Sequence, residues 1–223
     1  MKISELKLEN KIKISHSDVL LIVDIQNDFI PGGALAVKGG DDIIAGVNAT
    51  SDIFKAKGAR VVLTQDWHPV NHKSFASAHP GKKPFDPYSA PGIGPVLWPD
   101  HCVRGEGGAN FSPLLNTVVA DAIIRKGMNP EIDSYSAFLE NDKKTETGLF
   151  GYLKSLKVAR CFICGLALDY CVYYSALDGK SLGFDIYVII DLTRGIDDPK
   201  GSISNALETM TNKGIKFLKS EIF

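Results

Sequence analysis

The sequence has no long apolar run and no excess of charge of either sign. The longest apolar stretch, Val19–Ile25, is interrupted by Asp24, whereas a helix that spans a membrane needs about 20 predominantly apolar residues. The 25 basic and 26 acidic residues leave a formal net charge of −1, and they form no basic stripe of the kind that binds nucleic acid. We therefore expect neither a membrane nor a nucleic acid as a partner.

Signs of secretion are missing as well. Residues 1–17 are charged and amphipathic, without the apolar core and cleavage site of a signal peptide, and we interpret them as an N-terminal extension. There are only four cysteines, among them Cys102 and Cys171. Cys161 and Cys164 lie in one apolar run, where positions three apart point to opposite faces of a strand, so we expect them in the core. A cytoplasmic protein with reduced thiols is expected.

Short apolar segments alternate with helical patterns along the rest of the chain. Strands are expected at residues 19–23, 60–64, 118–124, 159–164, 184–190 and 215–218, and helices from a cap at Asp41 or Asp42 to Lys57 and at residues 147–156, 172–182 and 202–212. This alternation predicts an α/β fold, a three-layer αβα sandwich around a mainly parallel sheet of about six strands. Residues 18–223 are expected to form a single domain.

Four reactive side chains lie at or just past the ends of predicted strands: Asp24, Asp66, Lys126 and Cys171. In a parallel sheet covered on both faces, the functional site lies beyond the carboxyl ends of the strands. Side chains from four separate strands would therefore converge on one crevice. This convergence indicates an enzyme.

Asp24, Lys126 and Cys171 form the first candidate constellation. A thiol is mostly protonated at neutral pH, so it needs a base or a nearby cation to act as a nucleophile. Asp24 can accept the thiol proton and later return it to a leaving amine, and Lys126 favours the ionised forms of both groups. Taken singly, each residue is better explained by a structural role: Asp24 as a cap, Lys126 as an exposed charge at a strand end and Cys171 as a small buried hydrophobe.

The regular pattern stops between residues 65 and 112, which hold seven of the eleven prolines and four of the five histidines. So long an irregular stretch inside a compact domain is usually functional. Asp66 and His68 face the same side of an extended backbone, and His101 follows farther on. One carboxylate and two imidazoles suit one divalent metal ion, with zinc expected ahead of manganese or iron. The segment is therefore interpreted as a metal-binding loop region.

The other histidines are weaker candidates for metal ligands. His72 and His79 lie in the same irregular segment and are possible substitutes as ligands. His16 precedes the first predicted strand and is expected at the surface.

Six short motifs carry a resemblance to a known family. They are Val23–Phe29 (VDIQNDF), Thr64–His68 (TQDWH), Trp98–Cys102 (WPDHC), Lys126-Gly127, Tyr135–Phe138 (YSAF) and Gly165–Val172 (GLALDYCV). In this order they resemble the isochorismatase-like cysteine hydrolases, and DWH together with WPDHC resembles the metal-containing nicotinamidase branch. The resemblance implies hydrolysis of nicotinamide to nicotinate and ammonia through a cysteine thioester, as a step of NAD salvage, with pyrazinamide accepted as well.

The resemblance also implies roles for individual residues of the catalytic centre. It implies Cys171 as the nucleophile, Asp24 as the proton acceptor and donor, and Lys126 as the third member of the triad. In the family, the peptide bond matching Leu166–Ala167 is cis, and the N–H groups at the positions of Ala167 and Cys171 form the oxyanion hole.

For the surroundings of the catalytic centre, the resemblance implies a metal ion and a ring pocket. The implied metal ligands are Asp66, His68 and His101, and their ion orients the substrate through its ring nitrogen. The implied lining of the ring pocket is Phe29, Trp98, Tyr135 and Ala167.

Two other functions stay open. A related amidohydrolase for carbamoyl or ureido substrates would use the same triad, although such relatives generally lack the metal motifs. A non-catalytic nicotinamide-binding protein would have no use for an intact triad. The resemblance is also compatible with a homo-oligomer, and no motif assigns a role to residues 1–17 or to the glycine-rich stretch 104–110.

Overall fold

A parallel sheet of six strands forms the centre of the computed structural model, which describes all residues 1–223. The order of the strands across the sheet is β3-β2-β1-β4-β5-β6. Their bounds are Asp18–Val23 for β1, Arg60–Asp66 for β2, Ala122–Lys126 for β3, Arg160–Leu166 for β4, Asp185–Arg194 for β5 and Lys216–Leu218 for β6. Every neighbouring pair is parallel, which confirms the predicted sheet.

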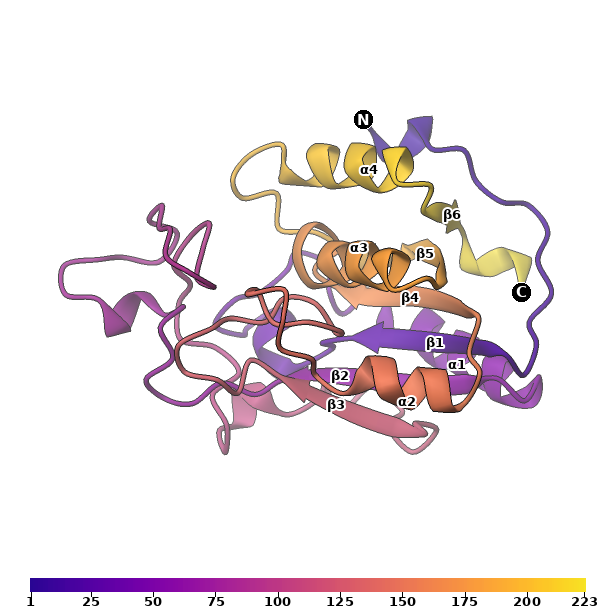
Figure 1. Cartoon of the computed structure of the whole chain (residues 1–223), viewed down its shortest axis with the longest axis horizontal. Coiled ribbons are helices and arrows are strands. Elements are labelled where there is room, and N and C mark those ends of the chain that lie inside the picture. Colours follow the sequence, from indigo (N-terminus) through magenta and orange to yellow (C-terminus); the bar gives the residue numbers. More distant parts are fainter.

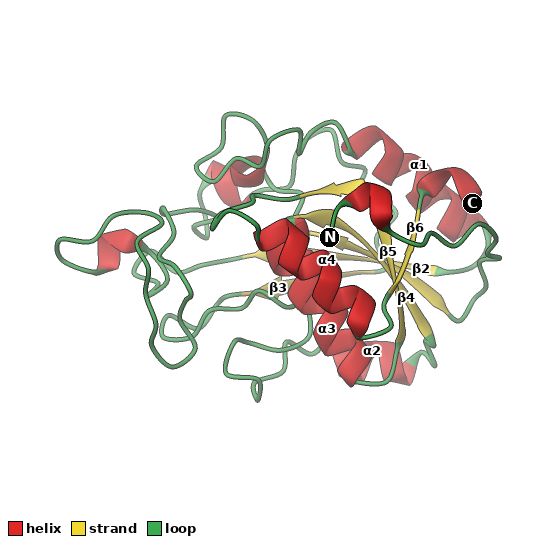
Figure 2. Ribbon diagram, turned by 90° about the horizontal axis from the view of Figure 1, so that it is seen from above, coloured by secondary structure: helices red, strands yellow, loops and turns green.

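Four α-helices cover the two faces of this sheet. They are α1 (Ile44–Ala56), α2 (Leu149–Ser155), α3 (Tyr173–Ser181) and α4 (Ser202–Asn212). Helix α1 lies on one face, and α2, α3 and α4 lie on the other (Figure 1, Figure 2). The predicted three-layer αβα sandwich is therefore confirmed.

The strand order reverses between β1 and β4. From β1 the chain continues outward to β2 and β3, whereas β4 returns to the other side of β1 and leads outward to β5 and β6. At such a reversal, the connections leave neighbouring strands in opposite directions and open a crevice at their carboxyl ends. Asp24 follows β1, and the turn with Cys171 follows β4, so both lie at this crevice.

The two central strands are buried on both faces. All six residues of β1 are buried, as are the last six of β4, which explains why both segments read as continuous apolar runs. Asp18 is the polar exception in β1, and its carboxylate accepts hydrogen bonds from Arg160 Nε at 2.7 Å and Arg160 Nη2 at 2.6 Å. This pair fixes the amino ends of β1 and β4 side by side.

A long irregular segment, residues 67–121, connects β2 to β3 and forms the magenta loops that extend farthest from the sheet in Figure 1. Single β-bridges join His68 to Val103 and Phe75 to Trp98 within it. These bridges bring the segment around Trp98 and His101 back onto the segment that follows β2. The loop is thus folded against the carboxyl end of the sheet.

One predicted strand was displaced along the chain. The strand expected at residues 118–124 begins only at Ala122, and Val118 is 92% exposed. The Asp121 N–H donates to Val61 O, and the Asp121 carboxylate accepts from Val61 N–H, so pairing with β2 starts at this point. The apolar residues before Asp121 belong to an exposed turn, because β3 is an edge strand with little packing to enforce its length.

Other element boundaries also differ from those expected, by up to four residues. The helix expected from a cap at Asp41 or Asp42 begins at Ile44, and its N-cap, Ile43, makes no side-chain capping bond. The strand expected to end at residue 190 continues to Arg194 after a register shift against β4. The helix expected at residues 172–182 begins with a π-helical turn at Leu168–Val172.

Residues 1–17 run along the β6 edge of the sheet. Leu8 forms a parallel bridge with Phe217, and Glu9 N–H donates to Phe217 O at 2.8 Å. The amino group of Met1 donates to Ser204 Oγ on α4 at 2.5 Å. No helix of the protein has the length and apolar character needed to cross a membrane.

Candidate active site

A pocket lies at the carboxyl ends of the strands, with about 340 Å³ of empty space when the open solvent at its mouth is included. It collects residues from the loop after β1, the irregular segment after β2, the loop after β3, the turn after β4 and the loop after β5. Its lining is Phe29, Leu35, Asp66, His68, Trp98, His101, Asp133, Tyr135, Ala167, Tyr170, Cys171 and Ile196.

Asp24 and Lys126 lie beneath Cys171, fully buried at the floor of this pocket. The Lys126 ammonium nitrogen is 2.9 Å from Asp24 Oδ2 and 3.4 Å from Cys171 Sγ. It also contacts Asp66 Oδ1 and donates to Ser134 O at 2.9 Å. One ammonium therefore joins both carboxylates to the thiol, and the structure brings the three predicted triad residues together.

Strand register and backbone conformation explain this convergence. Asp66 and Lys126 are direct partners in the pairing of β2 with β3, so their side chains emerge from the same face at the same level. Asp24 has a φ of 48°, in the left-handed region, which turns the chain sharply at the end of β1. Such backbone conformations in residues other than glycine are found disproportionately at functional sites.

Burial sets the proton affinities of the thiol and its partner carboxylate. It raises the pKa of Cys171 well above the ordinary value, and the opposing effect of Lys126 does not cancel it. Burial likewise raises the pKa of Asp24. Asp24 Oδ1 accepts a hydrogen bond from Thr64 Oγ1 at 2.6 Å, whereas Oδ2, although paired with Lys126, has no hydrogen-bond donor in good geometry. Oδ2 is therefore the oxygen open to a proton.

Cys171 occupies a π-helical turn between β4 and α3. Ala167 precedes the turn in extended backbone, after a cis Leu166–Ala167 peptide bond. Ala167 O accepts hydrogen bonds from the N–H groups of Tyr170 and Val172, both at 3.1 Å. These bonds hold the turn closed around Cys171.

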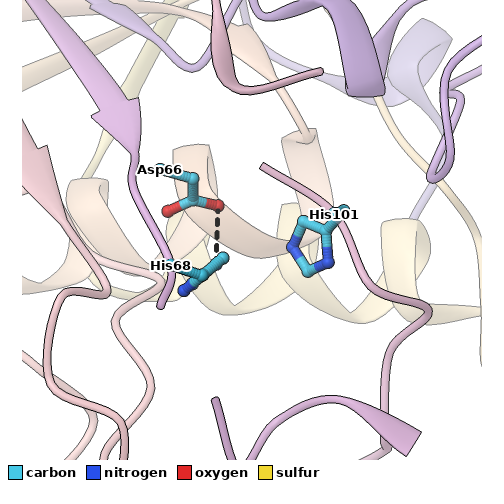
Figure 3. Close-up of side chains that lie close together, drawn as sticks. All are labelled: Asp66, His68 and His101. Carbon is cyan, nitrogen blue, oxygen red and sulfur yellow. Dashed lines mark ion pairs between the residues drawn. The ribbon is translucent and has the colours of Figure 1, made fainter. Parts of the chain in front are cut away.

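Asp66, His68 and His101 come together on one side of the pocket (Figure 3). Their ligand atoms lie within 4.8 Å of one another, and all three residues are buried. His68 Nε2 is 3.6 Å from Asp66 Oδ2, the carboxylate oxygen that does not face Lys126. One carboxylate and two imidazoles converging in a buried position fit a divalent metal ion.

The two histidine rings are oriented by backbone carbonyl groups, as metal-binding histidines usually are. His68 Nδ1 is 2.9 Å from Gly127 O, and His101 Nδ1 is 2.8 Å from Pro99 O. Gly127 has a φ of 67°, and a Cβ atom there would collide with the His68 ring, which explains the glycine after Lys126. Burial and the neighbouring His68 lower the pKa of His101 to about 4, so its ring is neutral.

Asp66 contacts both the predicted triad and the candidate metal ligands. Burial would raise its pKa, but Lys126 and His68 outweigh burial and hold the pKa of this carboxyl below its usual range. Its backbone is clamped by Gln26, whose Nε2 donates to Asp66 O and whose Oε1 accepts from Asp66 N–H, both at 2.8 Å. Gln26 lies inside the VDIQNDF motif, but sequence reasoning did not single it out.

The aromatic residues expected around the ring pocket, Phe29, Trp98 and Tyr135, do line it, and two of them are hydrogen-bonded to each other. Trp98 Nε1 donates to Tyr135 Oη at 3.0 Å, and Tyr135 Oη donates to Gly94 O at 2.8 Å. Tyr170 packs edge-on against Trp98, with ring centroids 4.8 Å apart. Because these polar groups are already used, Trp98 and Tyr135 present mainly apolar ring surface to the pocket.

Four lining residues were missed by sequence reasoning: Leu35, Asp133, Tyr170 and Ile196. Tyr170 adjoins Cys171 in the sequence, so its motif position was a usable signal. The other three lie in loops, and their proximity depends on how those loops fold.

A second group of donors adjoins the first and shares His68. The ligand atoms of His68, His72 and Asp133 lie within 4.8 Å of one another. Burial lowers the pKa of His72 to about 3, and His72 Nε2 has no hydrogen-bond partner. His79 Nε2 instead contacts Lys73 O at 2.8 Å and belongs to neither group. His16 is exposed, as expected.

Comparison with known proteins identifies the family of the chain. The Isochorismatase domain family matches residues 18–222. A nicotinamidase from Acinetobacter baylyi is 46% identical over 213 residues, which cover 96% of this chain and 97% of the relative.

Two solved structures extend the comparison to three dimensions. PnC1 from L. infantum in complex with nicotinate has 39% identity and a TM-score of 0.81, with 95% of this chain and 98% of that chain covered. The pyrazinamidase of Pyrococcus horikoshii in complex with zinc has 39% identity and a TM-score of 0.74, with 91% and 99% covered. The chain therefore belongs to the isochorismatase family, in the branch that contains the nicotinamidases.

Proposed function

We propose that this protein hydrolyses nicotinamide to nicotinate and ammonia, a reaction that returns the pyridine ring to NAD synthesis, with Cys171 as the nucleophile. The observation that carries the proposal is the meeting of a buried thiol, carboxylate and ammonium under a pocket with aromatic walls. The nicotinamidase from Acinetobacter baylyi and the nicotinate complex of PnC1 support the same substrate.

The first half of the reaction transfers the thiol proton to Asp24 Oδ2. Burial raises the pKa of Cys171, so the thiol starts protonated, while Asp24 starts as the carboxylate paired with Lys126. The Lys126 ammonium stabilises the negative charge on Asp24 before the transfer and on Cys171 after it. The thiolate attacks the amide carbon, and the new oxyanion accepts hydrogen bonds from the N–H groups of Ala167 and Cys171. Asp24 then protonates the nitrogen, the C–N bond breaks, and ammonia leaves a thioester.

The second half hydrolyses the thioester by the same route in reverse. Asp24, now a carboxylate, accepts a proton from an attacking water, and the resulting tetrahedral intermediate again uses the two N–H groups. The C–S bond breaks, nicotinate leaves, and the sulfur recovers a proton from Asp24. Lys126 keeps its proton throughout, because Asp24 and Asp66 outweigh burial and raise its pKa well above the usual value.

The aromatic wall of the pocket positions the pyridine ring, while Cys171 and Asp24 act on the carboxamide. Trp98, Tyr135 and Phe29 offer apolar ring surface. A divalent ion held by Asp66, His68 and His101 would supply a Lewis acid for the ring nitrogen, and we propose zinc, as in the Pyrococcus horikoshii pyrazinamidase structure. Pyrazinamide has the same carboxamide and a ring nitrogen in the same position, so we propose it as a second substrate.

Ammonia release from nicotinamide, before and after removal of metal by a chelator, tests the proposal. We expect activity that disappears on chelation and returns with added zinc, manganese or iron. Activity that persists in protein shown by elemental analysis to be metal-free would reject Asp66, His68 and His101 as required ligands. A ureido substrate such as N-carbamoylsarcosine serves as the matched control, and turnover of it alone would overturn the proposed function.

A further inference from the structure

Asp169 is a buried carboxylate in the same turn as Cys171, and it has no cationic partner. It accepts three hydrogen bonds instead. Ile196 N–H donates to Oδ1 at 3.0 Å, Asp197 N–H donates to Oδ2 at 2.9 Å, and Ser202 Oγ donates to Oδ2 at 2.5 Å. Ile196 and Asp197 belong to the connection between β5 and α4, and Ser202 is the first residue of α4. One side chain therefore joins this connection and the start of α4 to the turn that holds Cys171 (Leu168–Val172), here called the catalytic turn.

The neighbouring Tyr170 adds a fourth bond to the same connection. Its hydroxyl donates to Asp198 O at 2.6 Å. The connection has little packing of its own, because Asp197, Pro199 and Lys200 are exposed and surface hollows border it on two sides. Its position is therefore fixed largely by hydrogen bonds, those from the catalytic turn and those that Asp197 Oδ1 accepts from the N–H groups of Gly201 and Ile203.

Ile196 is the member of this connection that reaches the pocket. Its side chain lines the pocket together with Trp98 and Tyr135, and its own N–H is one of the three donors to Asp169. The preceding residue, Gly195, is closely packed: a Cβ atom there would lie 2.7 Å from two carbons of Ile203 and 3.0 Å from Asp169 Oδ1. The backbone at Ile196 is thus fixed between the catalytic turn and the start of α4.

We propose that Ile196 determines which ring substituents the pocket accepts, and that Asp169 is the positioning residue that holds Ile196 in place. This inference rests on the proposed function, since it concerns the ring of the same substrate. An aliphatic wall restricts the pocket by shape, and a difference of one methyl group against such a wall commonly changes kcat/KM by about 10-fold or more.

The test compares nicotinamide with 5-methylnicotinamide and 6-methylnicotinamide, using kcat and KM for each. Ile196→Ala is expected to raise the kcat/KM of at least one methylated substrate relative to nicotinamide by about 10-fold. Asp169→Asn is expected to shift this ratio in the same direction and to raise the KM for nicotinamide by about 10-fold, with kcat changed less than about threefold. An amide cannot accept all three bonds, because its NH₂ group is a donor.

Asp191→Asn is the matched control. Asp191 also accepts a backbone N–H and a hydroxyl, both from Ser220, at 2.9 Å and 2.6 Å respectively. It does not line the pocket and does not belong to the catalytic turn. It is expected to leave the substrate ratio unchanged. If Asp169→Asn does not fold, Ser202→Ala replaces it, with one bond lost and an expected KM increase of about two- to threefold.

Unchanged substrate ratios in both Ile196→Ala and the Asp169 or Ser202 variant would overturn the inference. A fall of kcat in Asp169→Asn, with KM and the ratio unaltered, would also overturn it, because Asp169 would then act on the catalytic turn alone. Failure of the wild-type protein to release ammonia from nicotinamide would instead reject the proposed function, so the two failures are distinguishable.

Discussion

The floor of the pocket and its wall are built in different ways. In the floor, Asp24 follows the central strand β1 and Lys126 ends the edge strand β3. The pairing of Lys126 with Asp66 places these two residues at the same level of the sheet. The wall residues Trp98 and Ile196 come from loops. Trp98 is held by a β-bridge to Phe75 and by its bond to Tyr135 Oη, and Ile196 is held by the bond from its N–H to Asp169. Charge chemistry that tolerates little displacement is thus placed on rigid elements, while ring recognition is placed on segments that substitutions can adjust.

Removal of the floor's cation should have the largest effect. Lys126→Met leaves Asp24 and Asp66 buried without their shared ammonium, so we expect a loss of about 3–5 kcal/mol in the free energy of unfolding. Ammonia release should fall by at least about 10³-fold. Urea denaturation and a turnover assay measure the two effects.

Lys143→Met is the control for that experiment. Lys143 pairs with Asp178, but its side chain is 45% exposed and water can reach the pair, so its loss should cost about 1 kcal/mol and leave turnover intact. Equal losses of unfolding free energy and of turnover in the two variants would mean that a cation in the floor matters no more than an exposed one.

Removal of one proposed metal ligand tests whether the residues between the floor and the wall hold a metal ion. His101→Ala is expected to lower metal affinity by at least about 100-fold, and metal content after dialysis, measured by elemental analysis, should fall accordingly. His79→Ala is the control, because His79 lies in the same loop but contacts Lys73 O outside the donor groups. Full metal content in His101→Ala would remove His101 from the site.

A change confined to the wall should act on binding rather than on chemistry. Trp98→Phe removes the donor to Tyr135 Oη while keeping an aromatic ring, and Tyr135 retains its bond to Gly94 O. We expect KM for nicotinamide to rise about three- to tenfold with kcat nearly constant. Steady-state kinetics decide the matter, and a larger change in kcat than in KM would assign Trp98 to the chemical step.

The smallest effect is expected at an ion pair remote from both regions. Burial would raise the pKa of Asp121, but hydrogen bonds from Lys55 and Val61 N–H, together with the charge of Arg60, lower it below the unfolded value. A lowered folded pKa contributes stability above about pH 4, and this stability is lost as the pH falls through the folded pKa. Asp121→Asn should therefore cost at most about 1 kcal/mol at pH 7 and nothing in strong acid. A cost in chemical denaturation that does not change with pH would contradict this assignment.

The same comparison explains what the sequence could predict. Asp24 and Cys171 were placed at one crevice because apolar runs locate strands, and parallel strands end together. His68 was placed beside Asp66 by the alternation of side chains along an extended backbone. Trp98 was linked to the site only by motif resemblance, since no local pattern shows how residues 67–121 return to the sheet. Asp133 and Ile196 escaped prediction because their approach depends on individual hydrogen bonds between segments distant in the sequence.

The most direct test of the account is turnover by Cys171→Ala, combined with a calorimetric measurement of nicotinate binding. The account predicts a loss of ammonia release of at least about 10³-fold, with nicotinate bound within a few-fold of the wild-type affinity, because the aromatic wall is untouched. Substantial residual turnover in this variant would contradict the assignment of Cys171 as the nucleophile.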